Sequence, residues 1–234
     1  MKIYYDLHIH SALSPCGDND MTPNNIVNMS ILKGLDVIAV TDHNACGNVR
    51  SVIEASDGRI LVIPGMEIET SEEVHIVSLF PTPDAAEEME KIIREHKVKI
   101  ANKPDIFGHQ YLMDANDEII GEESDLYLTS SGLDIYTVVN EVKKLGGVAY
   151  PAHIDRDSYS VLSNLGMIPP DLSVETVEIT ANGRERLYER YSKEYNVITS
   201  SDAHYLGDIS EQMYSLDISN KKIDEILAKL LFKN

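Results

Sequence analysis

Six of the eight histidines in this chain lie in short motifs that carry carboxylates or border an apolar run. Hydrophobic strands that end in imidazole and carboxylate groups can direct them into one pocket, where such groups bind divalent metal ions. The pattern therefore predicts a multinuclear metal centre. Its candidate motifs are DLHIH (6–10), TDH (41–43), GMEIE (65–69), VHIV (74–77), PAH (151–153) and SDAH (201–204).

The DLHIH motif has the two-residue period of a β-strand. Such a strand places Asp6, His8 and His10 on one face, with neighbours on that face about 6.6 Å apart. Two imidazoles at this spacing can bind the same metal ion or adjacent ions, and we expect Asp6 to orient the ligands or the strand. The alternative is a pair of histidines in a half-buried strand, because an HxH pattern often occurs by chance.

The loop after this motif carries two acids and a cysteine. We predict Asp18 as a carboxylate ligand, because the segment before Thr22 must fold back over the end of the first strand. Asp20 is the rival and is interpreted as a solvated turn acid. Cys16 and Cys46 each flank a metal motif, so thiolate ligation or a local disulfide is conceivable. We favour small loop residues for both, since the set of histidines and carboxylates is already complete.

The next two motifs follow apolar runs. In DVIAVTDH the end of a strand would expose His43, while Asp42 could hold the tautomer of a metal ligand from behind. The run ILVIPG leads to Glu67, a carboxylate placed to bridge two cations. We interpret Glu69 as a solvated turn acid.

His75 begins an apolar run instead of ending one. A hairpin-like reversal over 68–73 would bring His75 back to Glu67, and a core histidine is the competing interpretation. His153, Asp202 and His204 directly follow buried-type strands, so they are easier to assign as ligands.

Seven apolar and β-branched runs alternate with helical patterns. Repeated strand and helix predict an α/β fold with a mainly parallel sheet. Metal residues at so many strand ends favour a barrel, because a barrel gathers the carboxyl ends of its strands around one mouth. The predicted strands lie at 3–9, 36–40, 60–63, 74–80, 147–150, 174–180 and 197–200, and helices are predicted at 24–33, 134–145 and 184–195.

The length of 234 residues suits a single domain, 1–234. The strand and helix pattern weakens over 81–133, where one helix is predicted at 84–99. We interpret 81–133 as a subfamily-specific insertion over one face, in a place suited to a lid. Thr22 followed by Pro23 predicts a capped helix start.

The formal net charge is −19, and no basic run exceeds a Lys-Lys pair. The counterion release that supplies most nucleic-acid affinity is therefore missing, so we expect no nucleic-acid partner. Bound metal ions would instead attract a small anionic substrate. We expect a cytoplasmic protein with no membrane partner, because no segment approaches the ~18 apolar residues of a membrane span, no secretory signal is recognisable, and only two cysteines are present.

Taken together, the motifs resemble the PHP (polymerase and histidinol phosphatase) family of metal-dependent phosphoesterases. The resemblance runs from Tyr5 to Tyr205, through DLHIH, the TPNNIVNMSILKGLDVIAVTDHN block, PGMEI, PAH and SDAH in order. It implies a distorted (β/α)7 barrel with up to three divalent ions at the C-terminal ends of the strands. It also implies metal roles for His8, His10, Asp18, His43, Glu67, His75, His153, Asp202 and His204.

Hydrolysis of a phosphate ester needs a nucleophile at neutral pH and compensation for charge on the phosphoryl oxygens. Two or three divalent ions supply both, and these ligands fit Mn, Fe or Zn. We therefore expect a phosphatase or phosphodiesterase that acts on a small phosphorylated molecule by attack of a metal-bridging hydroxide. Catalytic roles are expected for Glu67, Asp202 and His204. Arg156 and Arg184 are candidates to bind the phosphate, with surface ion pairs an equal alternative.

Two other functions stay open. A metal-activated hydroxide also attacks carbonyl carbon, so an amidohydrolase-like activity is the first alternative. Amidohydrolases often carry a carboxylated lysine ligand, however, and no strand-end lysine is present. The second alternative is a noncatalytic metal-binding regulatory module, which the complete ligand set disfavours.

Overall fold

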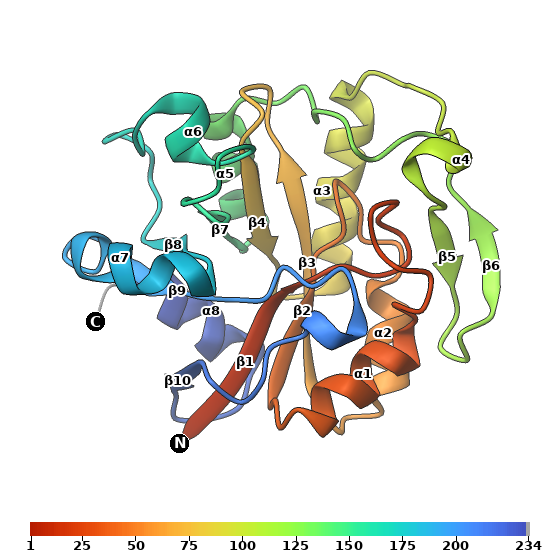
Figure 1. Ribbon diagram of the computed structural model, residues 1–234, viewed down its shortest axis with the longest axis horizontal. Coiled ribbons are helices and arrows are strands. Elements are labelled where there is room, and N and C mark those ends of the chain that lie inside the picture. Colours follow the sequence, from red (N-terminus) through yellow and green to blue (C-terminus); the bar gives the residue numbers. More distant parts are fainter. Residues whose placement is uncertain (233–234) are drawn as a thin grey trace.

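A curled six-stranded sheet runs through the computed structural model, which describes residues 1–232 (Figure 1). β1, β2 and β3 are parallel neighbours, whereas β4 runs antiparallel to both β3 and β7. Residues 70–74 are too few for the crossover that a parallel pair needs, so β3 and β4 form a hairpin. The strand order is β10 (Ser215–Asp217), β1 (Lys2–Ile9), β2 (Val37–Val40), β3 (Leu61–Glu69), β4 (His75–Leu79) and β7 (Val148–Pro151).

Strands β8 (Thr176–Glu178) and β9 (Asn196–Ile198) form a separate parallel pair between the two edges of the curl. After β7, the Ile154 amide donates to the Glu178 carbonyl at 2.8 Å. Beyond β9, Ala203 forms a parallel bridge with Ile9 of β1.

The α/β class is confirmed, and the curl is consistent with a PHP-type barrel. The hairpin of β3 and β4 confirms the reversal predicted over 68–73, which brings His75 back to Glu67. The antiparallel pairing of β4 with β7 and the separate β8–β9 pair depart from the mainly parallel sheet that was expected.

Alternate residues of the inner strands face two different cores. In β2, Val37 and Ala39 join one buried cluster, while Ile38 and Val40 join the other. The two-residue period of a strand requires this division. The first of these clusters fills the inside of the curl and includes three buried side chains of α8 (Ile223–Leu231).

A bulge in β1 changes which residues face inward. The register of β1 against β2 shifts between Asp6 and Ile9. Before the shift Leu7 belongs to the inner cluster, and after it Ile9 belongs to the outer one. The even-numbered residues His8 and His10 therefore face inward, as is common for bulges beside functional sites. The prediction that Asp6 shares their face is wrong, because it assumed an unbroken alternation.

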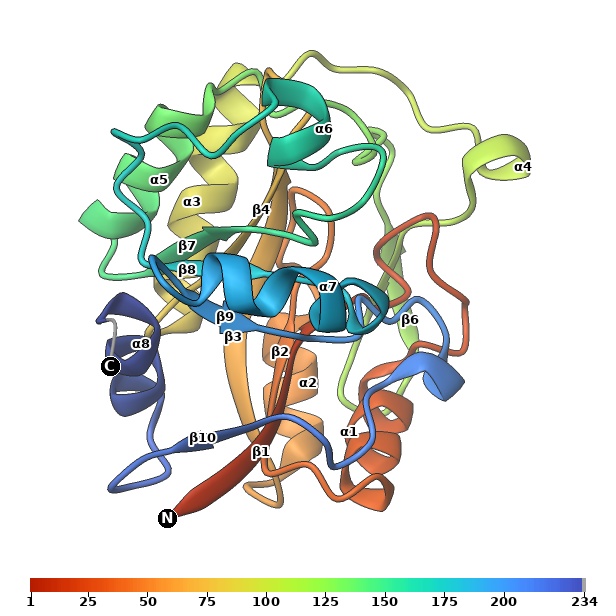
Figure 2. The ribbon, with the colours of Figure 1, turned by 60° about the vertical axis from the view of Figure 1, so that its left-hand side comes forward.

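Helices pack outside the six-stranded sheet (Figures 1 and 2), and the capped helix start predicted at Thr22–Pro23 is confirmed. Thr22 accepts the Asn25 amide and Thr82 accepts the Ala85 amide, and each is followed by proline at the first helical position. These outer helices are α1 (Pro23–Leu32), α2 (Val49–Ser56), α3 (Pro83–His96) and α5 (Ile135–Lys144), and further helices are α7 (Ala181–Tyr191), the short α6 (Val161–Leu165) and a 3-10 turn at Leu206–Asp208.

After α3, the region predicted as an insertion forms the short α4 (Pro104–Phe107) and a hairpin of β5 (Tyr111–Met113) and β6 (Ile119–Glu122). The hairpin is held against the loops that follow β1 and β2. The Tyr111 amide donates to the Ala12 carbonyl, and the Met113 amide donates to Asn48 Oδ1, both at 2.9 Å. Over residues 1–232, no helix combines the length and apolar character needed to cross a membrane.

Candidate metal centre

Eight of the nine predicted ligand side chains converge at one end of the curled sheet. The carboxyl ends of β1 and β2 meet at this edge because the strands are parallel, and the antiparallel β4 presents its first residue there. The side chains come from β1 (His8, with His10 one residue beyond it), the loop after β2 (His43), β3 (Glu67), the start of β4 (His75), the loop after β7 (His153) and the loop after β9 (Asp202 and His204).

The Glu67 carboxylate is the centre of this cluster and is only 1% exposed. Nitrogen atoms of five imidazoles lie within 3.4 Å of its oxygens. The distances are 2.8 Å for His75 Nδ1, 3.0 Å for His43 Nδ1, 3.1 Å for His153 Nε2, 3.3 Å for His8 Nε2 and 3.4 Å for His10 Nε2. Five imidazoles around one buried carboxylate make an arrangement suited to shared metal ligation.

Asp202 faces the same group from the loop after β9. Its Oδ1 lies 3.0 Å from His10 Nε2 and 3.3 Å from His8 Nε2, while its Oδ2 pairs with Arg156 at 2.6 Å. Asp202 has φ of 54° and His153 has φ of 26°, both in the left-handed region that non-glycine residues rarely adopt. Such backbone strain persists where the surroundings impose it, and it is concentrated at functional sites.

Glu178, the last residue of β8, accepts hydrogen bonds from two of the histidines on the side away from Glu67. Its carboxylate accepts the Nδ1–H of His8 at 3.0 Å and the backbone amide of His153 at 3.1 Å. The bond to Nδ1 leaves Nε2 of His8 directed at Glu67 and Asp202. Sequence reasoning missed this residue, although a glutamate between Val177 and Ile179 in an apolar strand is a usable signal.

The buried carboxylates and imidazoles of the centre shift one another's pKa values. Burial opposes a positive charge on His8, but the carboxylates of Glu178, Asp202 and Glu67 outweigh it and raise the pKa of His8 well above its usual range. Burial also opposes the charge on Glu67, but the imidazoles of His75, His8 and His43 hold its pKa well below normal. Burial and the neighbouring His204 and His43 lower the pKa of His10, so this ring stays a neutral electron-pair donor.

Some of the buried polar atoms of the cluster lack a hydrogen-bond partner, which suits coordination of divalent ions. Nε2 of His8 and Nε2 of His10 face each other at 3.3 Å, although the other nitrogen of each ring already has a hydrogen-bond partner. Glu67 Oε2 and His153 Nδ1 are buried without a hydrogen bond. Three overlapping groups keep their ligand atoms within 4.8 Å: His10, His43 and His204; His8, His10, Glu67 and Asp202; and His43, Glu67 and His75.

Two predicted ligands, His153 and Asp18, lie outside these three groups. His153 Nε2 still contacts Glu67 at 3.1 Å, whereas Asp18 lies in the loop after β1. Its carboxylate accepts the Asp20 amide at 2.8 Å within the loop, whereas its own amide donates to the His204 carbonyl. The loop thus joins the site through its backbone. Cys16 and Cys46 are both free, so no local disulfide forms. Partial burial would raise the pKa of the Cys16 thiol, but His43 and His204 beside it lower that pKa to about 7.

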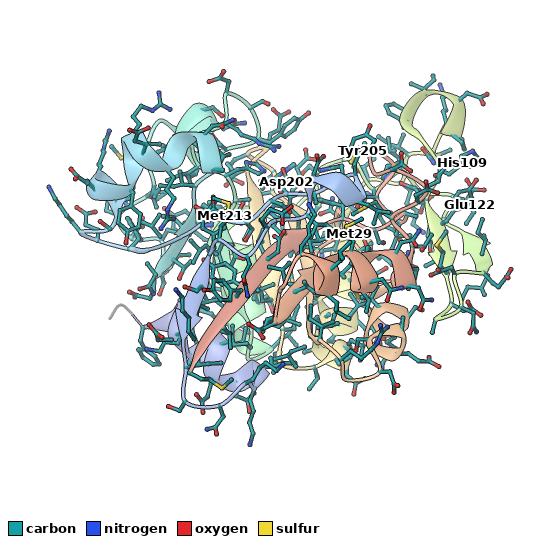
Figure 3. All side chains as sticks on the ribbon, turned by 60° about the horizontal axis from the view of Figure 1, so that its bottom comes forward. Met29, His109, Glu122, Asp202, Tyr205 and Met213 are labelled. Atoms are coloured by element: carbon teal, nitrogen blue, oxygen red, sulfur yellow. The ribbon has the colours of Figure 1, made fainter. Side chains whose placement is uncertain are left out.

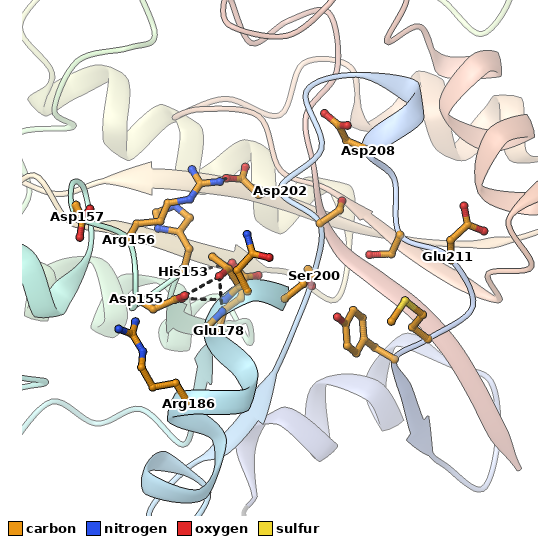
Figure 4. Close-up of a pocket in the computed structure, with 18 residues that line it drawn as sticks. His153, Asp155, Arg156, Asp157, Glu178, Arg186, Ser200, Asp202, Asp208 and Glu211 are labelled. Carbon is orange, nitrogen blue, oxygen red and sulfur yellow. Dashed lines mark hydrogen bonds and ion pairs between the residues drawn. The ribbon is translucent and has the colours of Figure 1, made fainter.

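The two arginines that were predicted to bind phosphate, Arg156 and Arg184, line different cavities. Arg156 lines a cavity of about 690 Å³ together with Asp202, His153 and Glu178 (Figure 4). Arg186, which was not predicted, lines the same cavity. Arg184 instead lines a different cavity on the other side of α7. His109 pairs with Glu122 at 2.8 Å on the outer hairpin, away from Asp202 (Figure 3).

The fold and the cluster define an α/β protein with a centre suited to divalent metal ions. The family model described as PHP domain matches residues 6–231, so the chain belongs to the PHP domain family. The resemblance expected from the motifs is therefore confirmed.

The chain is 26% identical over 189 residues to a 5'-3' exoribonuclease of Haemophilus influenzae, a match that covers 64% of this chain and 68% of that protein. It is 25% identical over 205 residues to an uncharacterised protein of Methanocaldococcus jannaschii, covering 87% of this chain but only 22% of that protein. The chain thus spans about a fifth of this second relative.

Among solved structures, the lesion-specific endonuclease Q of Pyrococcus furiosus has a TM-score of 0.71 and 17% identity, over 99% of this chain and 56% of that one. A candidate metal-dependent phosphoesterase of Bifidobacterium adolescentis has a TM-score of 0.61 and 18% identity, over 97% and 95%. At these identities the two structures demonstrate a shared fold.

The expectation of no nucleic-acid partner is wrong. A sequence relative is an exoribonuclease, and a structural neighbour, endonuclease Q, has been solved with a 27-mer duplex that carries an abasic lesion at the active site. The physical reason is that net charge averages over the whole surface. The potential inside a buried site depends on the cations that its ligands hold, so an acidic chain does not exclude a polyanion.

Proposed function

We propose that this protein hydrolyses phosphodiester bonds of nucleic acid at a centre of two or three divalent metal ions. The observation that carries the proposal is the convergence of five imidazoles on the buried Glu67 carboxylate. Similarity to an exoribonuclease over 64% of the chain supports the substrate class. We also propose that the curled sheet corresponds to the distorted (β/α)7 barrel expected from the family.

The three overlapping ligand groups would together hold two or three ions, and Mn, Fe or Zn suits their imidazole and carboxylate donors. Bound there, such ions would act as Lewis acids toward a phosphoryl oxygen and lower the pKa of a coordinated water. Glu67 belongs to two groups and would keep their ions close together. Glu178 fixes the ring of His8 so that Nε2 points inward.

Arg156 is the residue that we assign to the substrate phosphate. Its guanidinium pairs with Asp202 Oδ2 at 2.6 Å, and its side chain is 46% exposed in the same cavity. A planar guanidinium in this position can donate to a phosphate oxygen while it keeps its ion pair with Asp202. The proposed role predicts that Arg156→Ala raises KM for phosphodiesters more than it lowers metal content.

Turnover of a substrate panel tests the proposal. Bis(p-nitrophenyl) phosphate, single-stranded RNA and DNA oligonucleotides, an amide and a lactone would each be incubated with the Mn-loaded protein and with the chelated protein. We expect metal-dependent cleavage of the phosphodiesters, and its loss in His10→Ala.

Three results would contradict the proposal. Cleavage of only the amide or lactone would establish the amidohydrolase-like alternative. Full metal content without any turnover would establish the noncatalytic module. Phosphodiester cleavage that survives His10→Ala would place the chemistry elsewhere.

A further inference from the structure

A second cavity, of about 500 Å³, lies beside α7, between this helix and strands β9 and β10. Figure 2 shows α7 lying across β8 and β9, with β10 below them. The volume is in the range of small-molecule sites. Four tyrosines contribute to its lining: Tyr5, Tyr188, Tyr195 and Tyr214.

The lining is free of acids in a strongly acidic protein. The chain has 39 aspartates and glutamates among 234 residues. None of them is among the described residues that line this cavity, whereas Arg184 and Lys229 are. The cavity is therefore a local exception to the overall charge, and it favours an anion.

Arg184 is held with unused donors. Its Nη1 donates to Thr199 Oγ1 at 2.9 Å, and its guanidinium lies 4.5 Å from the ring centre of Tyr188 and 5.5 Å from that of Tyr214. Within residues 1–232, no carboxylate forms an ion pair with Arg184. A guanidinium fixed by two rings keeps its remaining N–H groups available for an oxyanion at little entropic cost.

We infer that this cavity binds a nucleoside monophosphate unit. Arg184 would bind the phosphate, and the base would stack on the face of the Tyr188 ring that Arg184 does not cover, since Tyr188 is 41% exposed. Stacking on aromatic side chains and pairing with arginine is how proteins hold single nucleotides without reading sequence. The inference goes beyond the proposed function, because binding here does not depend on catalysis at the metal centre.

The unit has two sources, a free mononucleotide or part of a strand. Met213 and Tyr214 line both this cavity and the one that contains Asp202, so the two cavities are adjacent. A strand that enters the metal centre could therefore continue into the tyrosine-lined cavity.

Calorimetric titration with AMP, adenosine and inorganic phosphate tests the inference. We expect AMP to bind more tightly than adenosine or inorganic phosphate alone. Arg184→Met removes the guanidinium and should weaken AMP binding roughly tenfold or more. Tyr188→Ala removes the aromatic ring and should weaken AMP binding by about fivefold or more. Tyr188→Phe keeps the ring and should keep the affinity. Arg190→Ala is the matched control, because Arg190 lies on the same helix but does not line this cavity.

Asp202→Asn distinguishes the two sources. A free nucleotide should bind this variant as it binds the wild type, whereas a single-stranded pentanucleotide that spans both cavities should lose affinity in Asp202→Asn and in Arg184→Met. No AMP binding to the wild type, or AMP binding unchanged in Tyr188→Ala and Arg184→Met, would overturn the inference. If Arg184→Met does not fold, Tyr188→Ala against Tyr188→Phe decides it.

Discussion

Ser14 lies between His10 and Asp42 and connects them. Its hydroxyl donates to Asp42 Oδ1 at 2.6 Å, and its Oγ lies 3.0 Å from His10 Nδ1. Since the hydroxyl proton is used on Asp42, Oγ accepts the N–H of the ring. This series of hydrogen bonds fixes the tautomer of His10 and leaves its Nε2 directed at Glu67 and Asp202.

Ser14→Ala should weaken metal binding. The ring of His10 loses the acceptor that holds its tautomer, and a lost support of this kind costs about 10- to 100-fold in metal affinity. Competition with a chromophoric chelator would measure the change. Ser71→Ala, at an exposed serine, is the control and should bind as the wild type. Equal affinities in both variants would remove Ser14 from the site.

Glu178→Gln should act on His8 in the same way. The amide keeps the size of the side chain but removes the charge that raises the pKa of His8 and one acceptor for its Nδ1–H. We expect metal affinity to fall by about tenfold or more, with little change in the far-UV circular dichroism spectrum. A variant that keeps wild-type metal affinity would contradict this role.

Removal of metal should destabilise the folded chain. Ligand side chains from six segments, including β3 with Glu67, converge at this centre, so an ion that binds the folded state alone adds stability by mass action. Metal at about 100 times its dissociation constant would add about 2.7 kcal/mol to the free energy of unfolding. Urea unfolding with Mn and with chelator measures this difference. Identical midpoints would argue that the cluster binds no ion in the native state.

Lys97 gives a pH dependence outside the site. Burial lowers its pKa to about 8, and the Nζ lies 4.8 Å from the Tyr127 ring centre. The unfolded chain, with a lysine pKa of about 10.4, binds more protons between these two values, so stability should rise with pH over this window. Lys97→Met should flatten the rise. Urea unfolding at about pH 7 and pH 9.5 measures it, and an equally steep rise in the variant would refute the assignment.

Much of the fold was predictable because local signals decided it. Thr22-Pro23 marks the start of α1, and the helix predicted at 84–99 corresponds to Pro83–His96. The antiparallel β4 is also encoded locally, in the short link 70–74. The bulge in β1 is different, because its register depends on β2 and no single-strand pattern contains it.

The site shows the same division. Histidines and acids at strand ends were visible as motifs, but Glu178 contacts His8 across 170 positions of the sequence. Arg184 and Arg186 illustrate a second limit. They are two residues apart on α7, and a helix turns them to opposite sides, so only Arg186 lines the cavity of Asp202. Sequence alone did not fix the rotation of the helix.

The central claim is that Glu67 holds divalent ions together with the surrounding histidines. Anomalous X-ray diffraction from crystals of Mn-loaded protein tests it most directly. We expect at least two anomalous peaks about 3.5–4 Å apart, each in coordination distance of a Glu67 oxygen. A well-loaded crystal with no peak beside Glu67, or with its peaks elsewhere, would contradict the account.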